Sequence, residues 1–167
     1  DKLQVALSQG LDAAPHGLEP RRYPVFSKPI YNFGGLGFGS RVIASRADYL
    51  ATLTPGHMWM PLFEGRHVST DLAIVEGRVA WLRQATGAPT TGGMFDYWTV
   101  HAADEPALTA TLAGWVGRHL ASYTGMINVE TIGGVIIEAH LRFADQWPDL
   151  YGAGWVEALV GLYSRKT

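Results

Sequence analysis

Apolar residues recur three or four positions apart in four stretches of the chain, which is the spacing of one helix face. The clearest helix is predicted to begin at Asp104, with Pro106 in its first turn, and to end at Gly125. Shorter helices are predicted over residues 1–11, 45–53 and 155–163. Asp1 and Ser45 stand where they can cap the first two of these helices.

Between the helices, short runs of β-branched and aromatic residues end at glycine-containing turns, a pattern typical of antiparallel strands. The pairs Glu76-Gly77 and Gly133-Gly134 each separate two such runs and predict tight hairpins. Strands are expected over residues 23–28, 41–44, 67–75, 78–86, 97–101, 128–132 and 135–141. The apolar run over 57–63 is too short to predict a helix. Hairpins interspersed with a few helices predict an α+β fold rather than a doubly wound parallel sheet.

The last predicted hairpin carries two carboxylates. Counting outward from the Gly133-Gly134 turn places Glu130 opposite Ile137, next to Glu138, and a bulge would bring both acids onto one face. The β-branched residues around Glu138 indicate a buried face, where a carboxylate is costly unless a cation compensates it. The pair predicts either a Mg²⁺ site that also uses phosphate oxygens or an exposed pair of acids on a solvated hairpin.

Composition excludes several classes of protein. The 167 residues are 47% hydrophobic and carry a formal net charge of −2, so the chain can build a core but has no basic surface for nucleic acid or for a membrane. The absence of cysteine excludes disulfides, cysteine metal sites and a thiol nucleophile. No apolar run is long enough to span a bilayer, and the opening does not resemble a signal peptide. A soluble, cytoplasmic protein is expected.

A glycine-rich loop follows a lysine in an apolar strand. Only three of the thirteen basic residues are lysines, and one of them, Lys28, precedes Gly34, Gly35, Gly37 and Gly39. Such a loop can present several backbone N–H groups to an anion, so the lysine and the loop together can grip phosphates from two sides. The order of residues matches neither a P-loop nor a dinucleotide-binding motif, and a hairpin tip is the alternative interpretation.

The remaining chemistry is sparse. Arg142 lies four residues beyond Glu138 and either completes a basic set or forms a salt bridge with Asp145 or Asp149. No pair of histidines has the helical spacing of metal ligands, and there is no nucleophile elbow of the G-x-S-x-G kind.

In their order along the chain, these features resemble the ATP-grasp superfamily. The segments that carry the resemblance are the opening "DK", "YPVFSKP", "NFGGLGFGS", "MWMPLFEGRHVSTDL" and "NVETIGGVIIEAHLR". The resemblance runs from Lys2 to about Arg142. It implies one ATP-grasp-like domain over residues 1–167, with two small lobes of antiparallel sheet and flanking helices: a glycine-loop lobe over 20–60 and a metal-site lobe over 61–167.

The resemblance also implies a set of site residues. Phosphates would be contacted by Lys2, Lys28 and Arg83, and covered by the backbone of Gly34, Gly35, Gly37 and Gly39. Adenine would be lined by Trp59, Met60, Pro61 and Leu62. Mg²⁺ or Mn²⁺ would be held by Glu130, Glu138 and His140. The catalytic residues would be Lys28 and Arg142, the latter stabilising a phosphate or an acyl phosphate.

The implied activity is that of an ATP-dependent carbon–nitrogen ligase that forms an acyl phosphate from a small carboxylate. Three positions depart from the family pattern: Pro61 and His67 stand where acids are common, and His140 replaces an asparagine. The departures at His67 and His140, together with the short length of the chain, favour the alternative of a non-catalytic or regulatory nucleotide-binding module. The chain also lacks the amino-terminal domain that normally precedes these lobes. We therefore expect a homodimer, a partner protein that supplies this domain, or lost activity.

Overall fold

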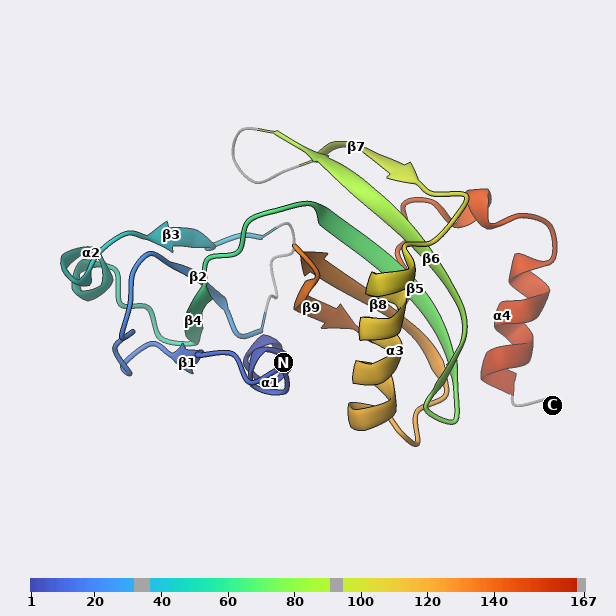
Figure 1. The fold of residues 1–167 in the computed structure, drawn as a ribbon, viewed down its shortest axis with the longest axis horizontal. Helices are drawn as coiled ribbons and strands as arrows, with labels where there is room; N and C mark the ends of the chain where they lie inside the picture. The colour runs from blue at the N-terminus through green and yellow to red at the C-terminus, as the bar shows by residue number, and fades with distance from the viewer. Residues whose placement is uncertain (32–36, 91–94, 165–167) are drawn as a thin grey trace.

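The computed structural model describes residues 1–31, 37–90 and 95–164, which form two antiparallel sheets (Figure 1). The first sheet has the strand order β1 (Ala14–Pro15), β4 (His57–Pro61), β2 (Val25–Pro29) and β3 (Arg41–Ile43). The second has the order β7 (Phe95–Val100), β6 (Arg78–Pro89), β5 (His67–Val75), β8 (Gly125–Ile132) and β9 (Val135–His140). The predicted α+β class, with two antiparallel sheets and flanking helices, is confirmed.

Both predicted tight hairpins are present. Glu76 and Gly77 have φ angles of 47° and 74°, and Gly133 and Gly134 have 57° and 84°. Two successive residues in the left-handed region match the right-handed twist of the strands that they join. The turns therefore fix the order β5–β6 and β8–β9 within the second sheet.

The helices are α1 (Lys2–Leu7), α2 (Arg46–Ala51), α3 (Pro106–His119) and α4 (Trp155–Ser164), with a 3₁₀ turn, η1 (Pro148–Tyr151), before the last. The two predicted caps are confirmed, since Asp1 accepts a hydrogen bond from the N–H of Gln4 and Ser45 accepts one from the N–H of Asp48. Among the described residues, no helix is both long and apolar enough to cross a membrane.

The predicted ends of α3 are wrong on both sides. Glu105, not Asp104, occupies the cap position, because its N–H donates to Gln84 Oε1 at 2.7 Å and so fixes the chain there before Pro106. The helix ends at His119. Gly125 instead begins β8, with a φ of 148°.

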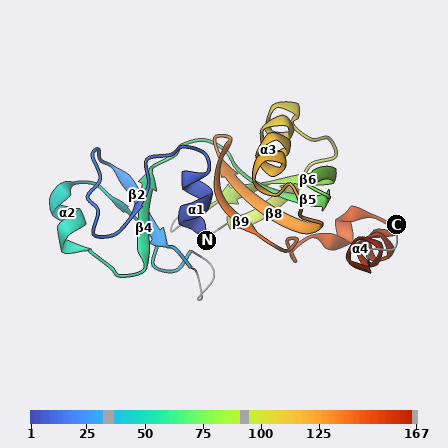
Figure 2. The same ribbon diagram turned by 90° about the horizontal axis from the view of Figure 1, so that it is seen from below.

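Helix α3 covers one face of the second sheet. Its buried residues Leu112 and Val116 share a hydrophobic cluster with Leu72 of β5 and Ile127 of β8. The views in Figures 1 and 2 agree that α3 lies against this sheet, and Figure 2 shows α4 past the end of the sheet, toward the side away from α3. The opposite face, away from α3, remains available for polar chemistry.

Helix α1 lies between the two sheets (Figure 2). Ala6 of α1 packs with Met58 and Met60 of β4, and Ile137 of β9 packs against the same cluster. Just after α1, the Gln9 side chain makes two hydrogen bonds to the backbone of Ile136: Nε2 donates to the carbonyl at 2.8 Å, and Oε1 accepts from the N–H at 2.9 Å. Strand β9 is the edge of its sheet, so Gln9 supplies the pairing that a neighbouring strand would give.

Replacing Gln9 by alanine should destabilise the fold by about 2 kcal/mol, because both bonds disappear and backbone groups of the buried Ile136 lose their partner. Urea denaturation of the two proteins measures the difference. The matched control is Gln4→Ala, an exposed position within the preceding helix α1, where the change should be close to zero. Equal effects at the two positions would show that Gln9 does not anchor β9.

Candidate functional site

The face of the second sheet away from α3 is polar where it approaches the first sheet. Alternate residues of a strand point to opposite faces. On β5, Val68 and Leu72 therefore join the cluster under α3, while His67, Ser69 and Asp71 point the other way. The "HVSTDL" segment thus combines a core face and a polar face in one strand.

Two carboxylates face each other on the neighbouring strands of this polar face. Glu130 of β8 pairs directly with Glu138 of β9, because the register shifts by one residue between Glu130 and Thr131. Residues nearer the turn keep the regular register, with Thr131 opposite Ile136. The bulge that would bring both acids together is therefore present, and the simple pairing of Glu130 with Ile137 is wrong.

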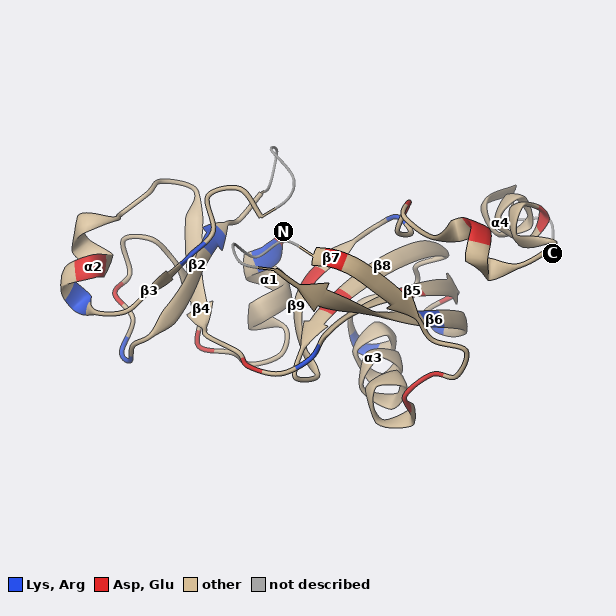
Figure 3. Cartoon of the chain, turned by 90° about the horizontal axis from the view of Figure 1, so that it is seen from above, with Lys and Arg blue, Asp and Glu red and all other residues tan. Residues whose placement is uncertain are grey.

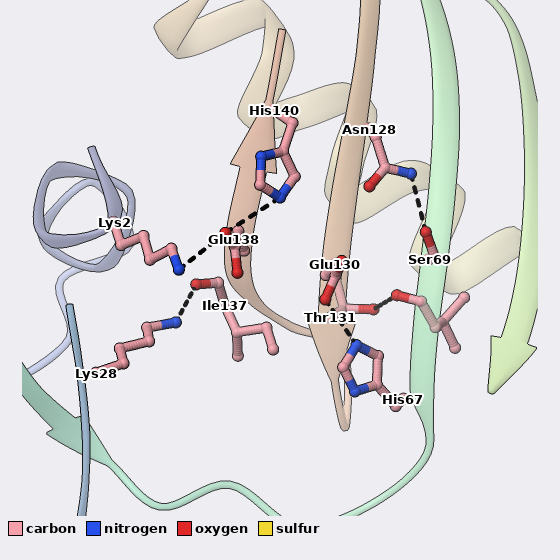
Figure 4. A network of polar contacts seen from close by, with 11 residues as sticks. Lys2, Lys28, His67, Ser69, Asn128, Glu130, Thr131, Ile137, Glu138 and His140 are labelled. Atoms are coloured by element: carbon pink, nitrogen blue, oxygen red, sulfur yellow. Dashed lines mark hydrogen bonds and ion pairs between the residues drawn. The ribbon is translucent and has the colours of Figure 1, made fainter. Parts of the chain in front are cut away.

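Glu138 is compensated by two groups (Figure 4). The Lys2 ammonium lies 3.0 Å from Glu138 Oε1, and His140 Nε2 lies 3.1 Å from the same oxygen. Burial alone would raise the pKa of Glu138, but the hydrogen bond from His140 and the charge and hydrogen bond of Lys2 outweigh it and lower the pKa to about 2. Glu138 is consequently a carboxylate at neutral pH.

Lys28 reaches the same strand from the first sheet. It is only 4% exposed, and its ammonium donates to the carbonyl of Ile137 at 2.6 Å. Burial lowers the pKa of Lys28 to about 8, and the neighbouring Lys2 adds to this effect against the opposing pull of Glu138 and Glu130. In Figure 3, the basic segments of α1 and β2 (blue) and the acidic segments of β8 and β9 (red) lie near the middle of the molecule, where the two sheets approach each other. Lys2, Lys28 and the two acids are thus brought together at the junction of the sheets.

Glu130 has an imidazole partner. His67 Nε2 lies 3.0 Å from Glu130 Oε2, and both side chains are partly exposed. His67 and His140, two of the three departures from the family pattern, thus each contact one of the paired acids. His140 is positioned here as the partner of Glu138, and its role as a metal ligand stays a prediction.

The donor set suits a metal ion that arrives with a phosphate. Within the described parts of the chain, no three His, Cys, Asp or Glu side chains are grouped closely enough to hold a metal. Mg²⁺ at nucleotide sites usually takes one or two carboxylates together with phosphate oxygens and waters, rather than a cage built from protein alone. Two adjacent carboxylates, Glu130 and Glu138, fit that requirement.

The predicted adenine segment spans the end of β4. Trp59 and Met60 are buried, Pro61 is half-buried, and Leu62 is exposed just past the strand. In the predicted glycine loop, Gly37 and Gly39 have φ angles of 66° and 78°, which favour glycine. The other two predicted loop residues, Gly34 and Gly35, lie outside the described residues.

The two arginines that were predicted as site residues, Arg83 and Arg142, contact backbone carbonyls rather than the paired acids. Arg142 is exposed and donates to the carbonyl of Phe143 at 2.9 Å. Among the described residues it forms neither of the alternative salt bridges, with Asp145 or with Asp149. Arg83 Nη1 donates to the carbonyls of His101 and Ala102, both at 3.1 Å. Their roles toward phosphate stay predictions.

A buried acid that the sequence reasoning did not single out organises the segment after β9. Asp71 is fully buried and accepts hydrogen bonds from Asn128 Nδ2, from the N–H of Ala144 and from the Tyr151 hydroxyl, at 2.6–3.0 Å. Burial raises the pKa of Asp71 despite these bonds, and the pKa of Tyr151 is raised by burial and by Asp71. The signal in the sequence that could have indicated this buried acid is an aspartate directly before the apolar run "LAIV".

A pocket of about 700 Å³ lies under α4 and is lined by Trp81, Tyr151 and Trp155 among others. None of the paired acids or the two lysines lines it, so it is separate from the acid cluster.

The sequence matches no model of a known protein family and no curated protein. Solved structures do resemble the fold. A protein assigned to the ATP-grasp superfamily, from Archaeoglobus fulgidus, is similar over 96% of this chain and 52% of its own, with 16% identity and a TM-score of 0.65. L-amino acid ligase from Bacillus licheniformis is similar over 86% of this chain and 40% of its own, with 14% identity and a TM-score of 0.59.

D-alanine–D-alanine ligase from Bacillus anthracis, in complex with ATP, is similar over 97% of this chain and 64% of its own, with 10% identity and a TM-score of 0.59. The chain has the ATP-grasp fold, as these structures and the order of its elements show. It spans about two fifths to two thirds of the lengths of these three proteins.

The buried Lys28 predicts a specific dependence of stability on pH. Its pKa in the folded chain, about 8, is below the usual 10.5, so between these values the unfolded chain binds more protons and stability rises with pH. Relative to Lys28→Met, the free energy of unfolding of the wild type should increase by up to about 3 kcal/mol from pH 7.5 to 10.5. Urea denaturation over this range measures it, and a constant difference between the two proteins would contradict the buried charge.

Proposed function

We propose that this chain binds ATP at the junction of its two sheets and supports the joining of a small carboxylate to an amine through an acyl phosphate. The observation that carries the proposal is the convergence of Lys28, Lys2 and the Glu130–Glu138 pair, contributed by β2, by α1 and by the second sheet. The ATP-grasp fold and the ligase neighbours support the same class of reaction.

The triphosphate needs charge neutralisation more than covalent chemistry, since phosphoryl transfer depends mainly on positioning and electrostatics. Lys28 suits this role because its ammonium is buried and already close to β9. Lys2 can exchange its contact with Glu138 for a phosphate oxygen. Glu130 and Glu138 would hold Mg²⁺ or Mn²⁺, which when bound neutralises phosphate oxygens.

In the proposed reaction, a carboxylate oxygen of the substrate forms a bond to the γ-phosphorus as the bond to the β-phosphate oxygen breaks, and ADP leaves with that electron pair. The amine nitrogen then attacks the acyl carbon, loses a proton, and displaces inorganic phosphate. Arg142, which is exposed and next to the end of β9, is proposed to stabilise the charge on the acyl phosphate. Backbone N–H groups of the glycine loop are proposed to cover the phosphates.

The second candidate function is nucleotide binding without catalysis. It is favoured by the imidazoles of His67 and His140, because each contacts one of the two acids that would hold the metal. Under that proposal the chain is a regulatory module of ATP-grasp fold.

Mg·ATP should raise the melting temperature of the wild type, and Glu138→Gln should remove most of this rise while leaving the unliganded protein folded. Binding at a hundredfold excess over Kd stabilises a protein by about 2.7 kcal/mol, which a thermal melt resolves. Differential scanning fluorimetry with and without Mg·ATP measures the effect. Glu157→Gln, in the first turn of the distant α4, is the control and should keep the full shift.

The two candidate functions differ in turnover. ADP release in the presence of carboxylates and amines, absent in Glu138→Gln, is the expected result for a ligase. A thermal shift without ADP release would favour the regulatory module, and no shift with Mg·ATP would overturn both.

A further inference from the structure

An aromatic surface continues directly from the paired acids. The imidazole of His67, which contacts Glu130, meets the rings of Phe95 and Trp98 edge-on, with centroids 4.7 and 5.8 Å away. Phe95 and Trp98 contact each other at 4.4 Å. We call Phe95 and Trp98 the aromatic wall. It lies on β7, on the same face of the second sheet as the acids.

The backbone of β6 makes room for this wall. Gly87 pairs with Trp98 in the β6–β7 ladder. A Cβ added to Gly87 would lie 2.4 Å from Cδ1 of Phe95, so the ring lies directly over the glycine. The register shift between Ala88 and Pro89 allows Phe95 to reach this position. Any larger residue at position 87 would therefore push the Phe95 ring away, so the glycine keeps this ring on the face that carries the acids.

The outer part of the wall is not core. Trp98 packs against Trp147, with ring centroids 5.2 Å apart. Trp147 belongs to a small hydrophobic cluster, and Trp98 packs against that cluster. Phe95 belongs to none of the hydrophobic clusters formed by the described residues, and both wall residues are partly exposed. An exposed aromatic ring beside a polar reaction site is suited to bind an apolar group.

The charges around the wall disfavour a phosphorylated or otherwise anionic group at this place. Arg83 donates to the carbonyls of His101 and Ala102, and Arg142 is assigned above to the acyl phosphate. Lys28 and Lys2 contact β9, where the proposed triphosphate would lie. A second phosphate-sized anion would therefore find no cation beside Phe95 and Trp98 among these groups.

From this juxtaposition we infer that the carboxylate substrate carries an uncharged aromatic group, which packs on the aromatic wall while its carboxylate points to the paired acids and their nucleotide. This inference rests on the proposed function and narrows the substrate class. The wall determines specificity and takes no part in bond making.

Three probes with the same carboxylate separate the possibilities: 3-phenylpropionate, propionate and 3-phosphonopropionate. Each is titrated into the wild type with Mg²⁺ and a non-hydrolysable ATP analogue, and binding is followed by ligand-observed NMR. We expect 3-phenylpropionate to bind at least about tenfold more tightly than the other two. Phe95→Leu and Trp98→Leu should each reduce this preference several-fold.

Tyr97→Leu is the matched control, since Tyr97 lies between the wall residues in sequence, is 62% exposed and points to the opposite face. It should keep the preference. Equal binding of the three probes, tighter binding of the phosphonate, or an unchanged preference in Phe95→Leu would overturn the inference. Phe95→Leu decides the matter even if Trp98→Leu does not fold. The thermal shift with the ATP analogue is measured first. A loss of nucleotide binding is then distinguished from a loss of the preference for the aromatic carboxylate.

Discussion

The contacts that join β9 to the first sheet and to α1 are the interactions on which the remaining structure depends. Strand β9 is a sheet edge, and its backbone is met by Gln9 from the segment after α1 and by Lys28 from β2. An edge strand with free backbone groups can pair with another chain. Here the same groups hold two sheets in a fixed relation, and Ile137 adds apolar contact with Met58 and Met60. The junction that stabilises the fold is therefore also the junction at which the charged residues meet.

Burial of charge at this junction is acceptable only because opposite charges are buried together. Glu138 keeps its charge because Lys2 and His140 contact it, whereas Lys28 holds its proton less tightly than an exposed lysine. The free energy needed to remove water from these charged groups is part of the free energy of folding, so it does not reduce the affinity for a ligand. A polyanion that replaces Glu138 as the partner of Lys2 would then enter a site whose charges are already positioned.

Local patterns in the sequence predicted those features that depend on neighbouring residues. The two tight hairpins followed from Glu76-Gly77 and Gly133-Gly134, whereas the sequence indicated the bulge beside Glu130 only as the condition under which both acids share a face. The start of α3 was wrong because Gln84, a residue of another strand, fixes Glu105. Strand β4 was not assigned, since its pairing with β2 rather than its own periodicity makes it a strand.

The features of the site that the sequence could not provide are long-range. The network around Asp71 uses Asn128, Ala144 and Tyr151, which are more than fifty residues away along the chain, and no local spacing indicates it. The contact of Lys2 with Glu138 joins α1 to β9, which are far apart along the chain. The resemblance to a known fold implied that Lys2 and Glu138 belong to one site, and the distance between them comes from the structure alone.

The single-residue offset beside Glu130 has a consequence for how this hairpin can change over evolution. Losing one residue of β8 between Glu130 and the glycine turn would shift this arm of the ladder by one position and turn Glu130 to the face under α3, since side chains alternate along a strand. Exchanges of one side chain for another leave that alignment intact. The segment should therefore accept varied residues far more readily than it accepts a change in length.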